Sequence, residues 1–120
     1  MKVAEKQVVW IGSALADLRK FPAEAQKMIG TALHWAQVGT KHPDAKPMKG
    51  FTGAGVLEIV EHHDGDTYRA VYAVRLGDVL YVLHAFQKKS KRGIATPKRD
   101  VDLIRSRLQD AKARHAGSRP

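Results

Sequence analysis

The chain has 120 residues and a mass of 13.3 kDa, which suits one domain and leaves no room for a separate cofactor-binding domain. Hydrophobic residues make up 43% and charged residues 28%, and no apolar run reaches the roughly 18–20 residues that cross a bilayer, so we expect a folded protein without a membrane partner. The formal net charge of +9 favours polyanionic partners, and the absence of cysteine excludes disulfides, thiolate nucleophiles and cysteine-type zinc sites.

The N-terminal third predicts one strand followed by two helices. Residues 7–11 are rich in β-branched and aromatic side chains and predict a strand that ends at Gly12. Ser13 is a candidate N-cap of a short helix, and Pro22 suits the start of a second helix that ends at Gly39. The apolar face of the second helix has the i, i+3, i+4 spacing and comprises Ala25, Met28, Ile29, Ala32, Leu33 and Ala36.

The next segment, from Gly39 to Gly55, shows no periodicity. It contains two prolines and two further glycines, so we predict a long surface loop. Long ordered loops in small domains often carry function. Lys46 and Lys49 lie in this segment and are therefore candidate binding residues.

Three consecutive strands follow, over residues 56–63, 67–76 and 79–87. Asp64-Gly65 separates the first two strands and Gly77-Asp78 the last two, and both pairs favour tight hairpins. The three strands therefore predict an antiparallel meander.

The middle strand has one apolar face and one face that carries two arginines. Tyr68, Ala70 and Tyr72 lie on one face of this strand, and Arg69 and Arg75 lie on the other. This alternation is expected where one side of a sheet packs on a core. If the helices cover the apolar side of the sheet, the opposite side is exposed to solvent. Arg69 and Arg75 would then project into solvent from a rigid strand. We accordingly predict that replacing Arg69 by alanine leaves folding intact.

The C-terminal region predicts one more helix and a tail. Thr96-Pro97 suits an N-cap and a first helical residue, and Val101, Ile104 and Leu108 form an apolar stripe behind it. We predict one domain over residues 1–115 and a frayed tail over 116–120. The whole order is β-α-α-β-β-β-α, which indicates an α+β fold.

Positive charge concentrates in the last quarter of the chain. Residues 88–120 hold 11 of the 21 lysines and arginines but 3 of the 12 acidic residues. Such a segment suits a phosphate backbone, although a solubilising basic tail has the same composition. The candidate cations are Lys46, Lys49, Arg69, Arg75, Lys88, Lys89, Lys91 and Arg92.

The histidines do not predict a metal site. His62 and His63 are adjacent on a strand and point to opposite faces, and no His-x-x-x-His pair occurs. We therefore expect neither a metal nor a cofactor. His84 stays a functional candidate because it lies on the last strand, shortly before the basic run.

The order and spacing of three sequence stretches resemble a known toxin superfamily. The stretches are residues 55–59 (GVLEI), 68–72 (YRAVY) and 81–91 (YVLHAFQKKSK), the last running on to Thr96-Pro97. Over roughly residues 8–108 the chain resembles the RelE/HigB superfamily of type II toxin–antitoxin toxins, in particular its phage-derived branch. The resemblance implies a compact RelE-like fold with two N-terminal helices packed on an antiparallel-rich sheet. It also implies a cytoplasmic endoribonuclease that cleaves mRNA on translating ribosomes and inhibits growth, together with a cognate antitoxin, commonly a small helix-turn-helix protein.

The resemblance also assigns roles to individual residues. In such toxins the RNA 2′-hydroxyl attacks the adjacent phosphate, and no metal is needed. Arg69 matches the phosphate-stabilising arginine of the family, and Lys88 or Lys89 matches its basic residue after the last strand. The candidate bases are one of these lysines, His84 and Glu58, and they follow from residue chemistry and not from the resemblance. The expected RNA-binding residues are Lys46, Lys49, Arg75, Lys91 and Arg92.

Two departures from the RelE pattern leave other functions open. Glu58 and Val60 stand where RelE carries two lysines, and no residue matches its C-terminal catalytic tyrosine. A non-catalytic gyrase poison of the ParE type and a nucleic-acid-binding accessory protein are the alternatives on the same fold, since fold alone does not fix function. The sequence leaves the oligomeric state and the codon preference open.

Overall fold

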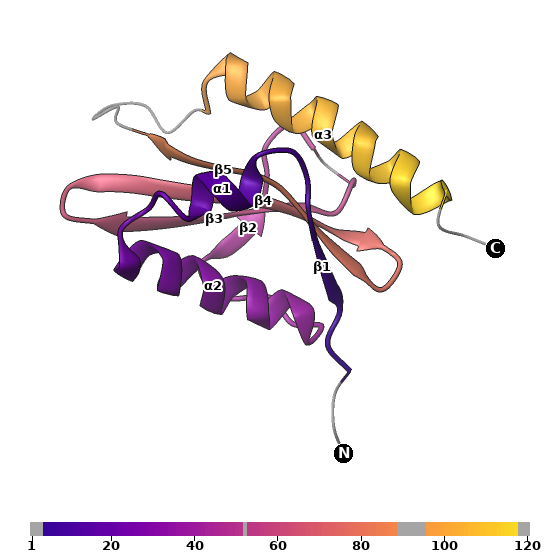
Figure 1. The fold of residues 1–120 in the computed structure, drawn as a ribbon, viewed down its shortest axis with the longest axis horizontal. Coiled ribbons are helices and arrows are strands. Elements are labelled where there is room, and N and C mark those ends of the chain that lie inside the picture. Colours follow the sequence, from indigo (N-terminus) through magenta and orange to yellow (C-terminus); the bar gives the residue numbers. More distant parts are fainter. Residues whose placement is uncertain (1–3, 52, 89–95, 118–120) are drawn as a thin grey trace.

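The computed structural model describes residues 4–51, 53–88 and 96–117. Figure 1 shows helices α1 and α2 on one side of a twisted sheet and helix α3 on the other. The elements in chain order are β1 Gln7–Trp10, α1 Ala14–Leu18, α2 Ala23–Gln37, β2 Ala45–Pro47, β3 Val56–His63, β4 Asp66–Leu76, β5 Val79–Lys88 and α3 Lys98–Gly117.

The sheet has the strand order β1-β5-β4-β3-β2. Strand β1 runs parallel to β5, and all other neighbours are antiparallel. The three strands of the predicted meander are confirmed to within one residue at each end. Asp64 and Gly65 form the first hairpin turn with φ values of 49° and 83°, and two successive positive values explain why an Asp-Gly pair occupies it.

The predicted loop between Gly39 and Gly55 contains strand β2, so the prediction of a structureless loop was wrong. Strand β2 pairs with β3 at the edge of the sheet, and Ala45, Met48 and Phe51 are buried. The order along the chain is therefore β-α-α-β-β-β-β-α. A three-residue edge strand that ends in proline is too short to show alternation, which is why the sequence pattern missed it.

A first hydrophobic core lies between the sheet and helices α1 and α2. The predicted apolar face of α2 is buried there, with Met28 half-buried at its margin. From the sheet, Ile59 and Tyr72 reach this core without any exposed surface. Burial on this scale stabilises the protein by about 25 cal/mol for each Å² of apolar surface removed from water.

A second core lies under α3, so the prediction of an open sheet face was wrong. Ile104, Leu108 and Ala111 of α3 pack on Val71 and Ala73 of β4. The α+β class is confirmed, but both sides of the sheet carry helices. The apolar stripe of α3 had no other surface on which to be buried.

Helix α3 covers this face of the sheet, and of the two arginines there one is buried and the other exposed. Arg69 lies near the N-terminal end of α3 and is 6% exposed, whereas Arg75 is exposed near the other end of β4. Arg69 thus lies in the interior of the protein. The prediction that its removal leaves folding intact rested on the open face and loses that basis.

Helix α3 continues to Gly117, two residues into the predicted tail, and residues 118–120 lie outside the described residues. Within the described part of the chain, no helix is both long enough and apolar enough to cross a bilayer.

Candidate functional site

A row of polar side chains crosses the side of the sheet that faces α3. The register pairs Lys46 of β2 with Glu58 of β3. It then pairs Glu58 with Val71 of β4, and Val71 with His84 of β5. Directly paired residues project from the same face, so the three polar side chains share it. Arg69 precedes Val71 by two residues and lies on that face as well.

Glu58 and Arg69 form a buried ion pair within this row. Arg69 Nη1 lies 3.5 Å from Glu58 Oε2, and the two residues are 6% and 8% exposed. Lys46 Nζ lies 3.9 Å from Glu58 Oε1 and reaches it from solvent. Arg69 Nη1 also donates to Thr96 Oγ1, at 3.5 Å, just before α3 begins. The cations compensate a carboxylate that has lost much of its hydration.

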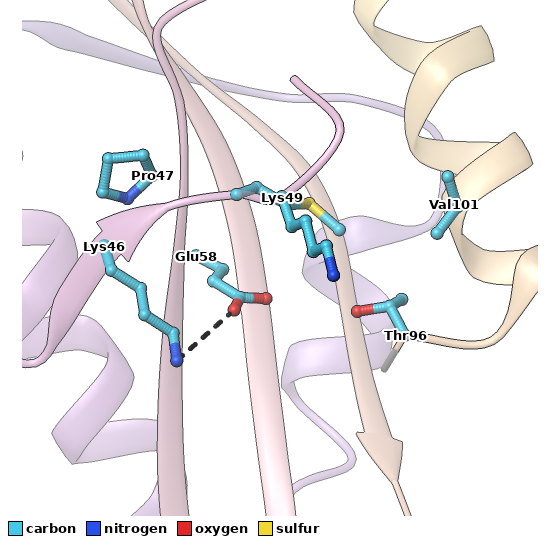
Figure 2. Close-up of a pocket in the computed structure, with 7 residues that line it drawn as sticks. Lys46, Pro47, Lys49, Glu58, Thr96 and Val101 are labelled. Carbon is cyan, nitrogen blue, oxygen red and sulfur yellow. Dashed lines mark ion pairs between the residues drawn. The ribbon is translucent and has the colours of Figure 1, made fainter. Parts of the chain in front are cut away.

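The ion pair borders an open cleft between β2, β3 and the start of α3. Its volume is about 450 Å³, and it is lined by Lys46, Pro47, Met48, Lys49, Glu58, Thr96 and Val101. Figure 2 shows the Lys49 ammonium group directed into the space between Glu58 and Thr96. Two lysines, a carboxylate and a hydroxyl around one cleft can bind a phosphate and transfer a proton beside it.

Strand β5 carries a bulge that turns His84 toward α3. Val71 pairs with His84, whereas the next residue of β4, Tyr72, pairs with Val82, so Leu83 is an extra residue in β5. Strict alternation from Val82 would place His84 on the α1 and α2 side. A bulge shifts the following side chain to the other face, and no signal in the sequence indicates it.

Both ring nitrogens of His84 are engaged. Nε2 lies 2.8 Å from Asp100 Oδ1, and Nδ1 lies 3.4 Å from Arg107 Nη1. A carboxylate only accepts and a guanidinium only donates, so a neutral ring protonated at Nε2 satisfies both neighbours. His84 is buried and stacks on Phe86 at a centroid distance of 4.7 Å. These contacts favour a positioning role over proton transfer.

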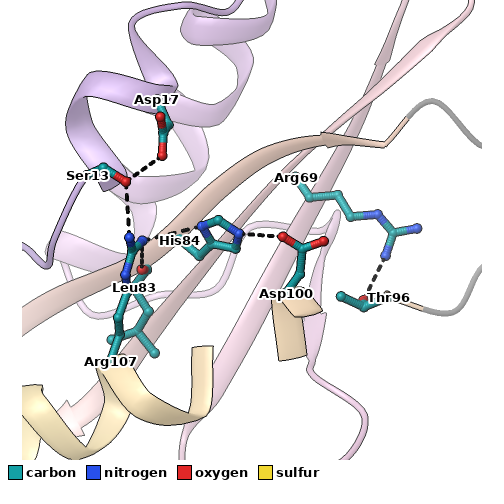
Figure 3. Close-up of polar contacts among 8 residues, drawn as sticks. All are labelled: Ser13, Asp17, Arg69, Leu83, His84, Thr96, Asp100 and Arg107. Atoms are coloured by element: carbon teal, nitrogen blue, oxygen red, sulfur yellow. Dashed lines mark hydrogen bonds and ion pairs between the residues drawn. The ribbon is translucent and has the colours of Figure 1, made fainter. Parts of the chain in front are cut away.

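Arg107 extends this network to the first helix, as Figure 3 shows. Its Nη1 donates to the carbonyl of Leu83 at 2.9 Å, and its Nη2 donates to Ser13 Oγ at 3.0 Å. Ser13 Oγ donates in turn to Asp17 Oδ2 at 2.7 Å and makes no side-chain cap hydrogen bond. The predicted helix cap therefore also links α1 to α3.

Gly12 makes room for the Arg107 side chain. Its φ is +57°, and a Cβ there would meet the Arg107 guanidinium at 2.9 Å. A side chain at position 12 would be strained and would also push Arg107 away from Ser13.

A second cavity of about 410 Å³ lies between α1, β5 and α3. Its lining residues are Asp17, Lys20, Phe21, His84, Ala85, Phe86, Gln87, Arg99, Asp100 and Leu103. His84 and Asp100 line this cavity, whereas Glu58 and Thr96 line the first. The polar row therefore reaches two adjacent surface hollows.

The structure brings together Glu58, Arg69, His84 and Lys46 on one face, with Lys49 at the cleft. Other predicted site residues lie elsewhere. The Arg75 side chain donates to the carbonyl of Gly53 at 3.1 Å, and by strand rise it lies about 20 Å along β4 from Arg69.

Four further predicted residues cannot be placed from their side chains. The backbone of Lys88 ends β5 opposite Thr67, which is the same end of the sheet as Arg69. Lys89, Lys91 and Arg92 lie outside the described residues.

Sequence reasoning did not identify Asp100 and Arg107 as site residues. Both lie on α3 outside its apolar stripe. The sequence pattern predicts that charged residues at such positions face solvent. Only the packing of α3 on the sheet brings them to His84. Thr96 was predicted only as a helix cap; α3 begins two residues later, at Lys98, and the Thr96 hydroxyl contacts Arg69.

Comparison with known proteins identifies the family of this chain. A search of solved structures finds the toxin–antitoxin complex RelBE2 from Mycobacterium tuberculosis, with a TM-score of 0.41, 21% sequence identity, and coverage of 74% of this chain and 98% of that chain. A search of curated proteins found no significant match to this chain. The family model "Phage derived protein Gp49-like (DUF891)" matches residues 16–109, which span Glu58, Arg69, His84 and Arg107. The chain therefore belongs to the phage-derived Gp49-like family, a family of RelE-like toxins.

Proposed function

We propose that this protein is the toxin of a type II toxin–antitoxin pair, and that it inhibits growth by cleaving mRNA on translating ribosomes. The observation that carries the proposal is the Glu58–Arg69 ion pair beside a cleft flanked by Lys46 and Lys49. Membership in a family of RelE-like toxins supports the toxin assignment. Its proposed partner is a neutralising antitoxin, a small helix-turn-helix protein.

The cleft has the size and the charges that RNA cleavage requires. Its volume of about 450 Å³ falls in the range of about 300–1,000 Å³ that is typical of small-ligand sites. Lys46 and Lys49 would hold the phosphate oxygens. The Arg69 guanidinium, whose position is fixed by Glu58 and Thr96, would stabilise negative charge that develops at phosphorus.

Glu58 is the best placed base for the proposed reaction. Its carboxylate would take the proton of the RNA 2′-hydroxyl while the 2′-oxygen attacks the adjacent phosphorus. The bond from phosphorus to the 5′-oxygen then breaks, and the departing oxygen takes a proton from an ammonium group, for which we propose Lys49. The products are a 2′,3′-cyclic phosphate and a 5′-hydroxyl end. No step in this scheme depends on a metal ion.

His84 has a positioning role in this proposal, because Asp100 and Arg107 occupy both of its nitrogens. Lys88 and Lys89 stay candidates for a cation at the scissile phosphate, and Lys91 and Arg92 for contacts to the RNA backbone. Arg75 is omitted from the site because it lies at the other end of β4.

The decisive experiment is induced expression followed by mapping of new mRNA 5′ ends. We would compare the wild type with Glu58→Gln and Arg69→Lys, which keep the size or the charge of the side chain. Glu24→Gln, at an exposed position on α2, is the matched control for loss of a carboxylate. Circular dichroism melts would establish that each variant folds.

Discrete cuts within translated frames that persist in Glu24→Gln and decrease in folded Glu58→Gln by about 10²-fold or more would support the proposal. Growth arrest with intact mRNA would contradict it and favour the ParE-type gyrase poison. Harmless expression would favour the nucleic-acid-binding accessory protein.

A further inference from the structure

Three side chains with metal-binding atoms meet on the opposite side of β3 from the proposed active site. They are His42 and Asp44, just before β2, and Glu61 near the end of β3, and their ligand atoms all lie within 4.8 Å of one another. Glu61 follows Ile59 by two residues and therefore faces the α1 and α2 side. The proposed active site does not use this cluster.

Glu61 is an unusual residue for this position. It is 7% exposed, and one of its carboxylate oxygens lies within 4.8 Å of an Asp44 carboxylate oxygen. Burial and the nearby Asp44 raise the pKa of Glu61, while His42 and His62 lower it to a smaller extent. Two ionised carboxylates in contact repel each other. A cation bound between the two carboxylates would remove this repulsion.

His42 supplies a third ligand of a different kind. Its Nδ1 lies 3.9 Å from Asp44 Oδ2, whereas two ligands bound about 2.1 Å from one tetrahedral ion are separated by roughly 3.4 Å. A small rotation of the exposed Asp44 side chain would bring the two atoms to that separation. The ring packs edge-on against Trp35 at 5.1 Å, which restricts its orientation. Nδ1 also accepts the Asp44 backbone N–H at 3.0 Å. A cation on this nitrogen would displace that N–H toward solvent, where water can accept its hydrogen bond.

We propose that His42, Asp44 and Glu61 bind one zinc ion, with water as the fourth ligand. An imidazole nitrogen with two carboxylate oxygens suits zinc, whereas magnesium and calcium prefer ligand sets made of oxygen alone. The ion would place two positive charges between the carboxylates and would neutralise both.

The site is structural and not catalytic. It would join the segment before β2 to the end of β3 and so hold the edge strand in register. Lys46 and Pro47 of β2 line the cleft on the other face of the sheet. Zinc binding would therefore fix the position of Lys46 without contacting RNA. The proposal is independent of the proposed ribonuclease activity.

Zinc binding to untagged, chelator-treated protein tests the proposal by equilibrium dialysis and thermal melting. We expect one equivalent of zinc and a higher melting temperature in its presence, with little effect of magnesium. Glu61→Gln and His42→Ala should each lower zinc affinity by at least about tenfold. Glu61→Gln removes the carboxylate repulsion, so it should also stabilise the zinc-free protein, which keeps the test valid if His42→Ala folds poorly.

The matched control is His63→Ala combined with Asp64→Asn. His63 Nε2 lies 3.3 Å from Asp64 Oδ2 in the nearby turn, so the control removes a histidine and an aspartate outside the cluster. It should leave zinc binding unchanged.

Absence of stoichiometric zinc at 100 µM free metal, about the upper limit for a useful structural site, would overturn the proposal. Equal binding by Glu61→Gln would do the same, and a stabilised Glu61→Gln with no zinc in the wild type would show that the pair holds a proton.

Discussion

Glu58 and Glu61 lie three residues apart on one strand and are equally buried. Their side chains lie on opposite faces of the sheet and have neighbours of opposite charge. Glu58 faces α3 and is compensated by Arg69 and Lys46. Glu61 faces α1 and α2 and meets another carboxylate, that of Asp44. An odd separation on a strand puts two side chains on opposite faces. The comparison shows that the face of the sheet decides whether a buried carboxylate meets cations of the protein or a second carboxylate.

The largest expected effect comes from removing the cation beside Glu58. Arg69→Ala should lower the free energy of unfolding by about 3 kcal/mol, because Glu58 would remain buried with only an exposed lysine beside it. Urea denaturation measures this change. A loss below about 0.5 kcal/mol would show that Glu58 is well solvated and would remove the contrast with Glu61.

A double-mutant cycle sharpens the same point. Arg69→Ala combined with Glu58→Gln should recover much of the lost stability, since no buried carboxylate is left without its partner. If the double variant is as unstable as the sum of the single variants, the two side chains contribute independently.

Glu61→Gln should act in the opposite direction and depend on pH. The pKa of Glu61 is raised above its ordinary value of 4.5, so the folded protein binds this proton more tightly than the unfolded chain. The wild type therefore loses stability as pH rises from about 4.5 through the raised pKa. In chelator, Glu61→Gln should be more stable than wild type at pH 7 and lose this advantage below about pH 4.5. Melting curves across pH 4–8 measure it, and a pH-independent difference would contradict the assigned cause.

A neutral buried group on the Glu61 side provides a smaller test. Burial raises the pKa of Tyr72 to about 12, and its hydroxyl has no hydrogen-bond partner among the described residues. Tyr72→Phe should increase the free energy of unfolding by up to about 1 kcal/mol. A decrease of similar size, measured by urea denaturation, would indicate that the hydroxyl is hydrogen-bonded in solution.

The smallest stability effect should come from Lys46→Ala. The Lys46 side chain is 66% exposed, and exposed ion pairs contribute about 0–1 kcal/mol. RNA affinity should nevertheless fall and depend less on salt, because one phosphate contact is lost. Fluorescence anisotropy with a short RNA, with Lys27→Ala as control, measures both. Unchanged affinity would remove Lys46 from the proposed binding surface.

The fold was predictable where periodicity or turn chemistry is strong. The alternation of β3, β4 and β5 and the Asp-Gly turn fixed the meander, and the stripe of α2 fixed its buried face. Strand β2 escaped prediction because it has three residues. The location of α3 also escaped it, because an apolar stripe shows that a helix is buried without showing on which surface.

The site was predictable only in part, for related reasons. Glu58, Arg69 and His84 were proposed as site residues from residue type and resemblance, but nothing in the sequence paired Glu58 with Arg69 or turned His84 toward Asp100. The bulge at Leu83 and the packing of α3 produce those contacts. His42 and Glu61 are 19 positions apart in the chain. Only the pairing of β2 with β3 brings the two chain segments that carry them close together.

The parallel pairing of β1 with β5 has a consequence for synthesis of the protein. Gln7 pairs with Val79, so β1 has its sheet partner in β5, which follows it by about 70 residues in the chain. Contacts this distant in sequence form late. The partners of Arg69 and His84 on the α3 side, Thr96 and Asp100, follow even later. A nascent chain therefore lacks the complete polar row until the start of α3 has been synthesised.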